Sequence, residues 1–287
     1  MVRVLVLGAT GRLGGMLRRH WDAPGLEPLW QARQGHDPGA GAWVMFDPRT
    51  DPLALAEACA AVDVVLDLAG PVPGPGRVVE SFAAIPPLAR AVAHGVRVAG
   101  GKPLLWASSA AVYGARARCH EADPLAPVSE YGRAKQAAEA ALAGLPGASA
   151  LRIGNVAGAD ALLSGAHPGV AVTLDRFADG CTPLRSYLGP KTLAETLFQL
   201  VIRAAEAPLP PVLNLSGPGP GVAMGDLLEA AGIGWQARPA PETALPEVVL
   251  DTARLAGLVP LSPETGTAPR IVAEWRADQA AHREAMS

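Results

Sequence analysis

The residues whose types and spacing best suit chemistry are Tyr131, Lys135 and Ser109. Tyr131 and Lys135 are four residues apart, so on a helix they lie on the same face. A lysine ammonium near a phenol stabilises the phenolate and lowers the pKa of the phenol, which lets tyrosine exchange a proton near neutral pH. Ser109 follows a predicted strand over Pro103–Ala107, where its hydroxyl could hold a substrate oxygen. Together these residues predict proton exchange at a substrate oxygen.

A glycine-rich turn near the N-terminus predicts a dinucleotide site. The apolar run Val2–Leu7 leads directly into three glycines at the spacing Gly-x-x-Gly-x-x-Gly, which is typical of a buried strand, a tight turn and a helix. One glycine makes the turn, one lets the backbone approach a pyrophosphate, and one lets the helix pack on the strand. Free N–H groups at the helix start suit phosphate. The predicted cofactor contacts here are Gly8, Thr10, Gly11, Arg12, Leu13 and Gly14.

The elements that must position these residues alternate between strand and helix, which predicts a doubly wound parallel sheet of the Rossmann type with right-handed crossovers. We expect residues 1–155 to form the dinucleotide-binding domain. Residues 156–287 are expected to form a small substrate-binding cap, with 185–216 returning to the core. The predicted strands are 2–7, 26–32, 43–46, 62–69, 103–107 and 212–216, and the predicted helices are 12–21, 52–61, 78–93, 128–143, 191–205, 224–231 and 269–285.

The residues after the second predicted strand bear on which dinucleotide binds. NAD sites usually have an acid roughly 20 residues beyond the glycines, but here the segment is Trp-Gln-Ala-Arg-Gln over residues 30–34. Arg33 instead suits the 2′-phosphate of NADP, and Arg12 could assist, so NADP is modestly favoured over NAD. Asp47 ends the third strand, where a carboxylate suits the adenine amino group. Leu68, Ala69 and Gly70 precede a Pro/Gly loop over residues 71–76 that is expected to pass the nicotinamide half.

Composition narrows the class of protein. The chain has 287 residues, of which 49% are hydrophobic and 18% charged, so a large core can form. The apolar runs end well before the roughly 18–20 residues that a membrane span needs, and no signal peptide is evident, so we expect a soluble cytoplasmic protein. A net charge of −3 without a basic run argues against nucleic-acid binding. The three cysteines match no metal spacing, so we predict reduced thiols and no metal.

These motifs, in this order, resemble the extended short-chain dehydrogenases/reductases, the NAD-dependent epimerase/dehydratase family. The resemblance rests on the glycine turn, on Ser-Ser-Ala-Ala-Val-Tyr-Gly over residues 108–114 and on the Tyr-x-x-x-Lys pair. It continues through the loop over 121–129, Leu-Arg-Ile-Gly-Asn-Val-Ala-Gly over 151–158, Arg-Ser-Tyr over 185–187, and the late strand segments at 212–216 and 248–255, and so covers nearly the whole chain.

The resemblance assigns roles to the three reactive residues. It implies that Tyr131 is the acid/base, that Lys135 tunes it and holds the nicotinamide ribose, and that Ser109 contacts the reacting oxygen. We prefer Ser109 to Ser108 because it stands directly before the Ala-Ala-Val-Tyr-Gly run. Tyr113 is expected to pack beneath the site.

Departures from the family pattern bear on the reaction. Sugar dehydratases of this family carry an acidic pair where this chain has Ala110 and Ala111, which disfavours dehydration; Ala110 is expected to border the substrate. Asn155 and Arg185 resemble residues that hold a diphosphate, and an arginine fork suits phosphate. The segment over 160–184 is short, and we expect it to lack the extended helix and strand with which larger relatives hold a nucleoside. This favours a smaller carbonyl substrate.

Several functions therefore stay open. The leading prediction is an NAD(P)-dependent oxidoreductase or epimerase that acts on a carbonyl or hydroxyl, including that of a nucleotide sugar. The alternatives are an NADP-dependent reductase of a small non-sugar carbonyl compound, and a non-catalytic dinucleotide-binding sensor or assembly protein. A homodimer through the helices predicted at 78–93 and 128–143 is a further option.

Overall fold

The centre of the structure is a parallel sheet of seven strands. A computed structural model describes residues 1–22, 24–35, 39–74, 79–165 and 172–284. The strand order is β12-β7-β5-β4-β1-β2-β3, and every neighbouring pair is parallel. This is the order of a Rossmann-type doubly wound sheet, which confirms the predicted fold class. The strands are β1 (Val2–Leu7), β2 (Leu26–Ala32), β3 (Ala42–Met45), β4 (Val64–Asp67), β5 (Leu104–Ser109), β7 (Ala148–Ile153) and β12 (Val212–Leu215).

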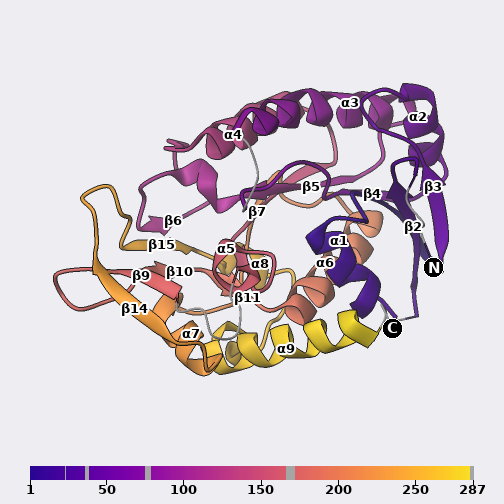
Figure 1. The fold of residues 1–287 in the computed structure, drawn as a ribbon. Coiled ribbons are helices and arrows are strands. Elements are labelled where there is room, and N and C mark those ends of the chain that lie inside the picture. The colour runs from indigo at the N-terminus through magenta and orange to yellow at the C-terminus, as the bar shows by residue number, and fades with distance from the viewer. Residues whose placement is uncertain (23, 36–38, 75–78, 166–171, 285–287) are drawn as a thin grey trace.

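Helices cover both faces of this sheet (Figure 1). The helices α1 (Arg12–His20) and α6 (Pro190–Glu206) pack on one face. On the other face lie α2 (Pro52–Ala60), α3 (Ile85–Val98) and α4 (Glu130–Leu142). Because both faces are covered, the central strands are apolar on both sides, which explains their near-continuous hydrophobic sequences.

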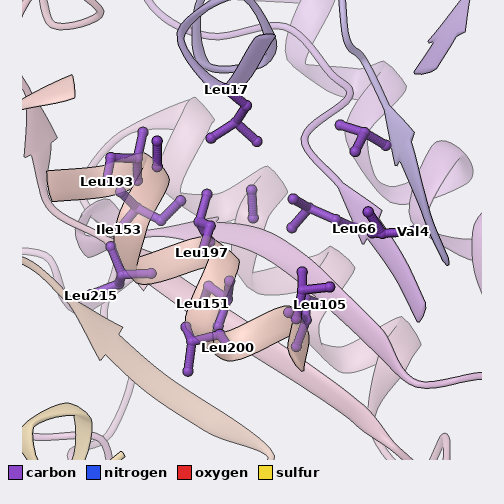
Figure 2. Packing of buried hydrophobic residues seen from close by; sticks show 14 of the residues in the cluster. Val4, Leu17, Leu66, Leu105, Leu151, Ile153, Leu193, Leu197, Leu200 and Leu215 are labelled. Carbon is purple, nitrogen blue, oxygen red and sulfur yellow. The ribbon is translucent and has the colours of Figure 1, made fainter. Parts of the chain in front are cut away.

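Alternate residues of each strand therefore enter different cores. Val4 and Leu66 point into the cluster under α1 and α6, whereas Leu5 and Val65 point into the cluster under α2 and α3. Figure 2 shows the first cluster, in which leucines of α6 interdigitate with those of the sheet. Each fully buried leucine or valine contributes about 1.5–3 kcal/mol relative to an exposed one. The labelled members are Val4, Leu17, Leu66, Leu105, Leu151, Ile153, Leu193, Leu197, Leu200 and Leu215.

The remaining elements form a second layer beyond the ends of these strands. Two parallel pairs, β8 with β11 and β9 with β14, and a sheet in the order β13-β10-β15-β6 lie there. A third apolar cluster joins them to the last helix. The elements are β6 (Arg118–Cys119), β8 (Asn155–Val156), α5 (Ala161–Ser164), β9 (Val172–Arg176), β10 (Leu184–Arg185), β11 (Tyr187–Leu188), β13 (Val222–Ala223), α7 (Met224–Ala230), β14 (Trp235–Pro239), β15 (Glu247–Leu250), α8 (Ala253–Ala256) and α9 (Ala268–Glu284). Of the three 3₁₀ turns, Val79–Ala84 packs beside α3 and α4 on the central sheet, and the others are Ala110–Tyr113 and Pro263–Gly266.

The segment over 160–184 corrects one expectation. It contains a strand, β9, which pairs in parallel with β14 over five positions. The sequence alone hides this strand because its partner lies about 60 residues later, so that the pairing is a tertiary event. The helix α5 is only four residues long, and residues 166–171 lie outside the described part of the chain.

Other element boundaries also differ from the sequence expectation. The helix expected at 78–93 divides into a 3₁₀ turn over Val79–Ala84 and α3, which continues to Val98. Pro86 and Pro87 lie in the first turn of α3, where proline starts a helix readily, and this explains the break. The strand expected at 62–69 is shorter, because Asp67 ends it by accepting a hydrogen bond from the backbone N–H of Ala69. Residues 78, 75–76 and 285 of the expected segments lie outside the described residues.

A buried carboxylate from α9 caps α6. The N-cap residue of α6 is Gly189, which has no side chain to accept the first N–H groups of the helix. Glu274 of α9 accepts hydrogen bonds from the backbone N–H and the hydroxyl of Thr192, at 2.8 and 2.9 Å. A Cβ at Gly189 would collide with that carboxylate. The last helix is thus fastened to the sheet-covering helix by a cap between distant segments.

Within the described part of the chain, no helix is both long and apolar enough to cross a membrane.

Candidate active site

A cleft of about 710 Å³ lies where the carboxyl ends of the central strands meet the second layer. In a doubly wound sheet this is the edge at which ligands bind. The cleft brings together most residues that the sequence singled out. Of the predicted residues, it is lined by Thr10, Gly11, Arg12, Leu13, Gly14, Leu68, Ala69, Gly70, Ser109, Ala110, Tyr131, Lys135, Asn155 and Arg185.

Three predicted residues are not part of this lining: Gly8, Arg33 and Asp47. Gly8 lies inside the glycine turn, and Arg33 is an exposed residue just after β2. Asp47 follows β3, and its carboxylate accepts hydrogen bonds from the backbone and guanidinium of Arg49. The hydrogen bonds from Arg49 hold the pKa of Asp47 below its usual value. Both oxygens of the Asp47 carboxylate thus already accept hydrogen bonds from Arg49, and its contact with adenine stays a prediction.

The glycine turn has the close packing that its spacing predicts. Gly8 has a φ of +77°, and a Cβ there would lie 2.7 Å from the Cα of Ala69. A Cβ on Gly14 would lie 2.6 Å from the carbonyl oxygen of Ala9, so these two positions are closed by backbone atoms. Gly11, at the start of α1, would meet only the carbonyl oxygen of Gly8, at 3.2 Å. The turn is thus closed on the sheet side at Gly8 and Gly14, and Gly11 borders the cleft.

The residues of the turn fit a dinucleotide phosphate. No side chain caps the N-terminus of α1, and its first turn holds no acidic residue. The free N–H groups and the positive end of the helix dipole can therefore receive an anion. The buried side chain of Gln31 braces the turn: its Oε1 accepts from the N–H of Gly8 at 3.0 Å, and its Nε2 donates to the carbonyl of Phe46 at 2.6 Å. The sequence analysis did not identify Gln31 as a support of this turn.

Ser109 and Ser108 have different partners. The hydroxyl of Ser109 borders the cleft, accepts a hydrogen bond from the N–H of Ala111 at 3.2 Å, and is hydrogen-bonded to Tyr131. Ser108 is almost fully buried and donates a short hydrogen bond, 2.5 Å, to Glu139 of α4. Ser109 therefore both caps the turn after β5 and contacts the reactive phenol. Ser108 is tied to the helix behind.

Tyr131 and Lys135 lie on one face of α4, as their spacing predicts. The ammonium of Lys135 lies 5.8 Å from the centre of the Tyr131 ring and 4.5 Å from that of the Trp106 ring. It donates a 2.6 Å hydrogen bond to the carbonyl of Ala107. Burial lowers the pKa of Lys135 to about 8, because water no longer solvates the ammonium.

Burial is the main influence on the pKa of the Tyr131 phenol in this structure. Burial raises the pKa of Tyr131 to about 12, and the hydrogen bond with Ser109 lowers it only in part. The Lys135 ammonium donates to the Ala107 carbonyl and lies over the Trp106 ring, and its effect on the pKa of the phenol stays a prediction. At neutral pH the phenol is therefore protonated. In this form Tyr131 is suited to donate a proton rather than to accept one.

The two arginines at the cleft are anchored by backbone carbonyls. Arg12 donates to the carbonyl of Ala159 at 2.8 Å, which links the glycine turn to the loop after β8. Arg185 donates from one terminal nitrogen to Leu184 and from the other to Leu245, at 2.8 and 2.7 Å. The role of Arg185 as a phosphate contact stays a prediction. A bound phosphate must share these nitrogens with the carbonyls.

A buried polar network behind the site was missed by the sequence analysis. Glu139 accepts hydrogen bonds from Arg152, at 2.8 and 3.1 Å, and from Ser108. Arg152 also donates to the hydroxyl of Tyr113, which donates in turn to Asn214. Tyr113 is fully buried, as expected. The spacing of four residues between Lys135 and Glu139 was the available signal, because it places both on one helix face.

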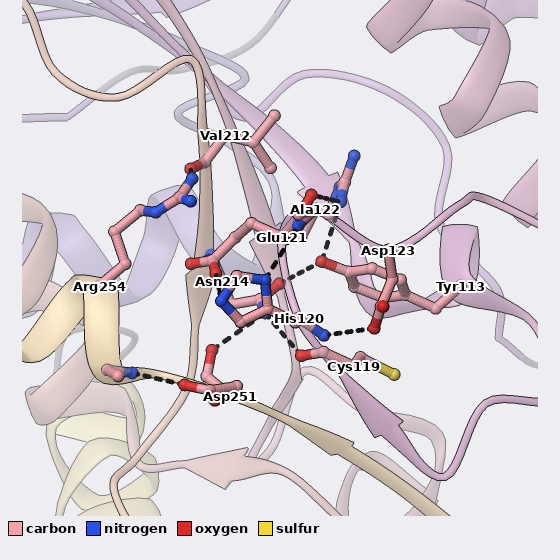
Figure 3. A network of polar contacts seen from close by, with 12 residues as sticks. Tyr113, Cys119, His120, Glu121, Ala122, Asp123, Val212, Asn214, Asp251 and Arg254 are labelled. Atoms are coloured by element: carbon pink, nitrogen blue, oxygen red, sulfur yellow. Dashed lines mark hydrogen bonds and ion pairs between the residues drawn. The ribbon is translucent and has the colours of Figure 1, made fainter.

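The network continues into the second layer. The backbone N–H of Asn214 donates to the carboxylate of Glu121, and its side chain donates to the carbonyls of Cys119 and Asp251, at 2.9 and 3.0 Å (Figure 3). These contacts join β12, β6 and the end of β15. The wall behind Ser108 and Ser109 is therefore held rigidly to both layers.

Comparison with known proteins agrees with the site. A sequence model of the NAD dependent epimerase/dehydratase family matches residues 4–168. A dTDP-6-deoxy-L-talose 4-dehydrogenase (NAD(P)(+)) of Kitasatospora kifunensis is 31% identical over 248 residues, which are 74% of this chain and 73% of that protein.

Solved structures show the same fold. The UDP-glucose 4-epimerase of Brucella ovis, in complex with NAD, superposes with a TM-score of 0.82 at 22% identity, over 96% of this chain and 97% of that one. The enzyme of the same name from Stenotrophomonas maltophila, with bound NAD and formylated UDP-arabinopyranose, gives 0.78 at 19% identity, over 99% and 100%. With the family match, the relative and the cleft taken together, this chain is an NAD(P)-dependent enzyme and belongs to the NAD-dependent epimerase/dehydratase family.

Proposed function

We propose that this enzyme is an oxidoreductase that interconverts a keto group and a hydroxyl group on the sugar of a nucleotide sugar. The proposal is carried by one observation: Ser109, Tyr131 and Lys135 converge in the same cleft that the glycine turn borders. As part of it, residues 1–155 bind the dinucleotide, and residues 156–287, apart from the returning segment 185–216, bind the substrate.

The geometry supports a role for each of the three side chains. The nicotinamide, when bound, supplies or accepts the hydride. Tyr131 is protonated at neutral pH, so in the reductive direction its hydroxyl donates a proton to the substrate oxygen as the carbonyl becomes an alcohol. Ser109 is hydrogen-bonded to Tyr131 and orients the same oxygen. The Lys135 ammonium stabilises the phenolate that is left and holds the nicotinamide ribose.

The substrate class is argued from the relative and from the cleft. The dehydrogenase that shares 31% identity acts, by its name, on a dTDP-6-deoxyhexose at carbon 4. The cleft volume lies within the usual range for small-molecule sites. Asn155 and Arg185 border it and, as part of the proposal, hold the diphosphate. With alanine at 110 and 111, no acidic pair is present to eliminate water, so redox chemistry is favoured over dehydration.

We further propose that NADP is preferred to NAD. The position at the end of β2 where NAD enzymes carry an acid is occupied by Ala32, and exposed Arg33 follows it. An arginine here can pair with a 2′-phosphate, whereas a carboxylate would repel it.

The test is a panel of dTDP- and UDP-linked 4-keto-6-deoxy sugars with NADPH or NADH, followed by cofactor absorbance and product analysis. We expect oxidation of NADPH with formation of a 4-hydroxy sugar, and a loss of at least about 100-fold in kcat for Tyr131→Phe. The proposal fails if the Phe variant keeps full turnover. Inversion of a sugar centre without net cofactor oxidation would instead identify an epimerase, and turnover of only free carbonyl compounds would identify the small-substrate reductase.

A further inference from the structure

Asp67 is a buried carboxylate at the edge of the active site that the mechanism above does not use. It is the last residue of β4 and is fully buried. Its Oδ1 accepts from the N–H of Ala69 at 2.9 Å, while its Oδ2 is buried and has no hydrogen-bond partner among the described residues. A buried charge of this kind is costly unless an opposite charge compensates it.

The sheet register places Asp67 next to Trp106, the residue over which the Lys135 ammonium lies. Asp67 pairs with Trp106 of the neighbouring parallel strand, so both side chains point to the same face of the sheet. On that face the Lys135 ammonium lies 4.5 Å from the centre of the Trp106 ring. Asp67 and Lys135 therefore approach the same indole from a neighbouring strand and from α4.

The other charged groups near Lys135 are already paired. Glu139, one helical turn away, forms a bidentate ion pair with Arg152. Cys59 of α2 faces Asp67, but burial raises the pKa of its thiol to about 12, so it carries no charge at neutral pH. Tyr131 is likewise neutral there. Among the groups facing Lys135 in the described structure, Asp67 is the carboxylate that lacks an ion pair of its own.

We propose that Asp67 is a positioning residue of the active site: its carboxylate is the counter-charge that keeps the Lys135 ammonium protonated and seated over Trp106. The effects of the two charges on each other's pKa are those expected of an ion pair. Lys135 lowers the pKa of Asp67 against the effect of burial, and Asp67 raises the pKa of Lys135. The proposal deepens the proposed function, since it rests on Lys135 as the partner of Tyr131.

The first test measures stability and is independent of activity. Urea midpoints are compared at pH 7.5 for the wild type, Asp67→Asn, Lys135→Met and the double variant. Each single change leaves one buried charge uncompensated, so we expect the double variant to be more stable than the sum of the single losses predicts. Asp63→Asn, at the exposed residue directly before β4, is the control and should combine additively with Lys135→Met. Additive losses for Asp67 and Lys135 would overturn the proposal.

A second measurement covers the case in which Asp67→Asn does not fold. Without Lys135, the Asp67 carboxyl keeps its proton to a higher pH, so the Lys135→Met protein should lose more melting temperature than the wild type between pH 5 and 8. Equal losses would contradict the pairing.

The third test uses the pH profile of kcat/KM with the substrate found above. Loss of the counter-charge should move the basic limb of the profile, set by Lys135, to lower pH by roughly one unit. A merely structural role would lower the rate at all pH values without moving the limb. If no substrate is turned over even by the wild type, the proposed function fails, while the stability cycle still decides the pairing.

Discussion

The buried ion pair behind the active site makes the sharpest prediction about stability. The side chains of Arg152 and Glu139 are 5% and 9% exposed, and three hydrogen bonds meet at the Glu139 carboxylate. Glu139→Gln keeps the shape but leaves the Arg152 charge buried among neutral acceptors. Removing one partner of a buried pair costs about 3–5 kcal/mol, and retained hydrogen bonds place this variant near the lower end. At ~2–3 °C per kcal/mol, the melting temperature should fall by roughly 6–9 °C.

A matched control lies on the same helix. Glu130 pairs with Arg133 in the first turn of α4, but both side chains are about half exposed, so water and salt screen the pair. Glu130→Gln should therefore leave the melting temperature nearly unchanged in the same calorimetric scan. Adding Arg152→Met to Glu139→Gln should recover part of the loss, because no uncompensated charge then remains. If Glu139→Gln costs no more than Glu130→Gln, the buried pair does not hold the site in the way described.

Three further predictions concern the cofactor side of the cleft. Gly14→Ala should prevent stable folding because its Cβ would meet backbone atoms, whereas Gly11→Ala should fold and mainly weaken dinucleotide binding. Thermal melts and cofactor titration measure the two effects, and equal effects of the two variants would contradict the packing. Arg33→Ala should lower the preference for NADPH over NADH, measured as the ratio of kcat/KM, by about tenfold. This corresponds to the loss of ~1.4 kcal/mol of interaction with the 2′-phosphate. An unchanged ratio would exclude Arg33 from the 2′-phosphate site. Burial raises the pKa of Asp67 to about 6, above its unfolded value. Ionisation of this carboxyl therefore lowers the free energy of unfolding as pH rises from about 4 to 6. Urea titrations across that range should show this fall for the wild type and not for the Asp67→Asn protein.

Much of the fold was predictable because its signals are local. The apolar run before Gly8 and the alternation of strand and helix depend on neighbouring residues, and parallel strands with crossovers permit few topologies. The family resemblance extended this to the assignment of Ser109, Tyr131 and Lys135. The structure differs from expectation at the 3₁₀ turn before α3, which depends on where the prolines lie, and at β9, whose partner strand is distant in the sequence.

The residues by themselves determined the kind of chemistry: a glycine turn for a dinucleotide and a tyrosine–lysine pair for proton exchange. The tertiary structure decided the state of those groups. Burial raises the pKa of Tyr131 because water is excluded. The guanidinium of Arg185 donates to backbone carbonyls, and that of Arg49 donates to the Asp47 carboxylate. Asp67 lies beside Trp106, over which the Lys135 ammonium lies, only because β4 and β5 are neighbouring strands that pair in this register. Contacts of this kind join residues far apart in the chain, and desolvation depends on everything packed around a group, so sequence spacing does not encode them.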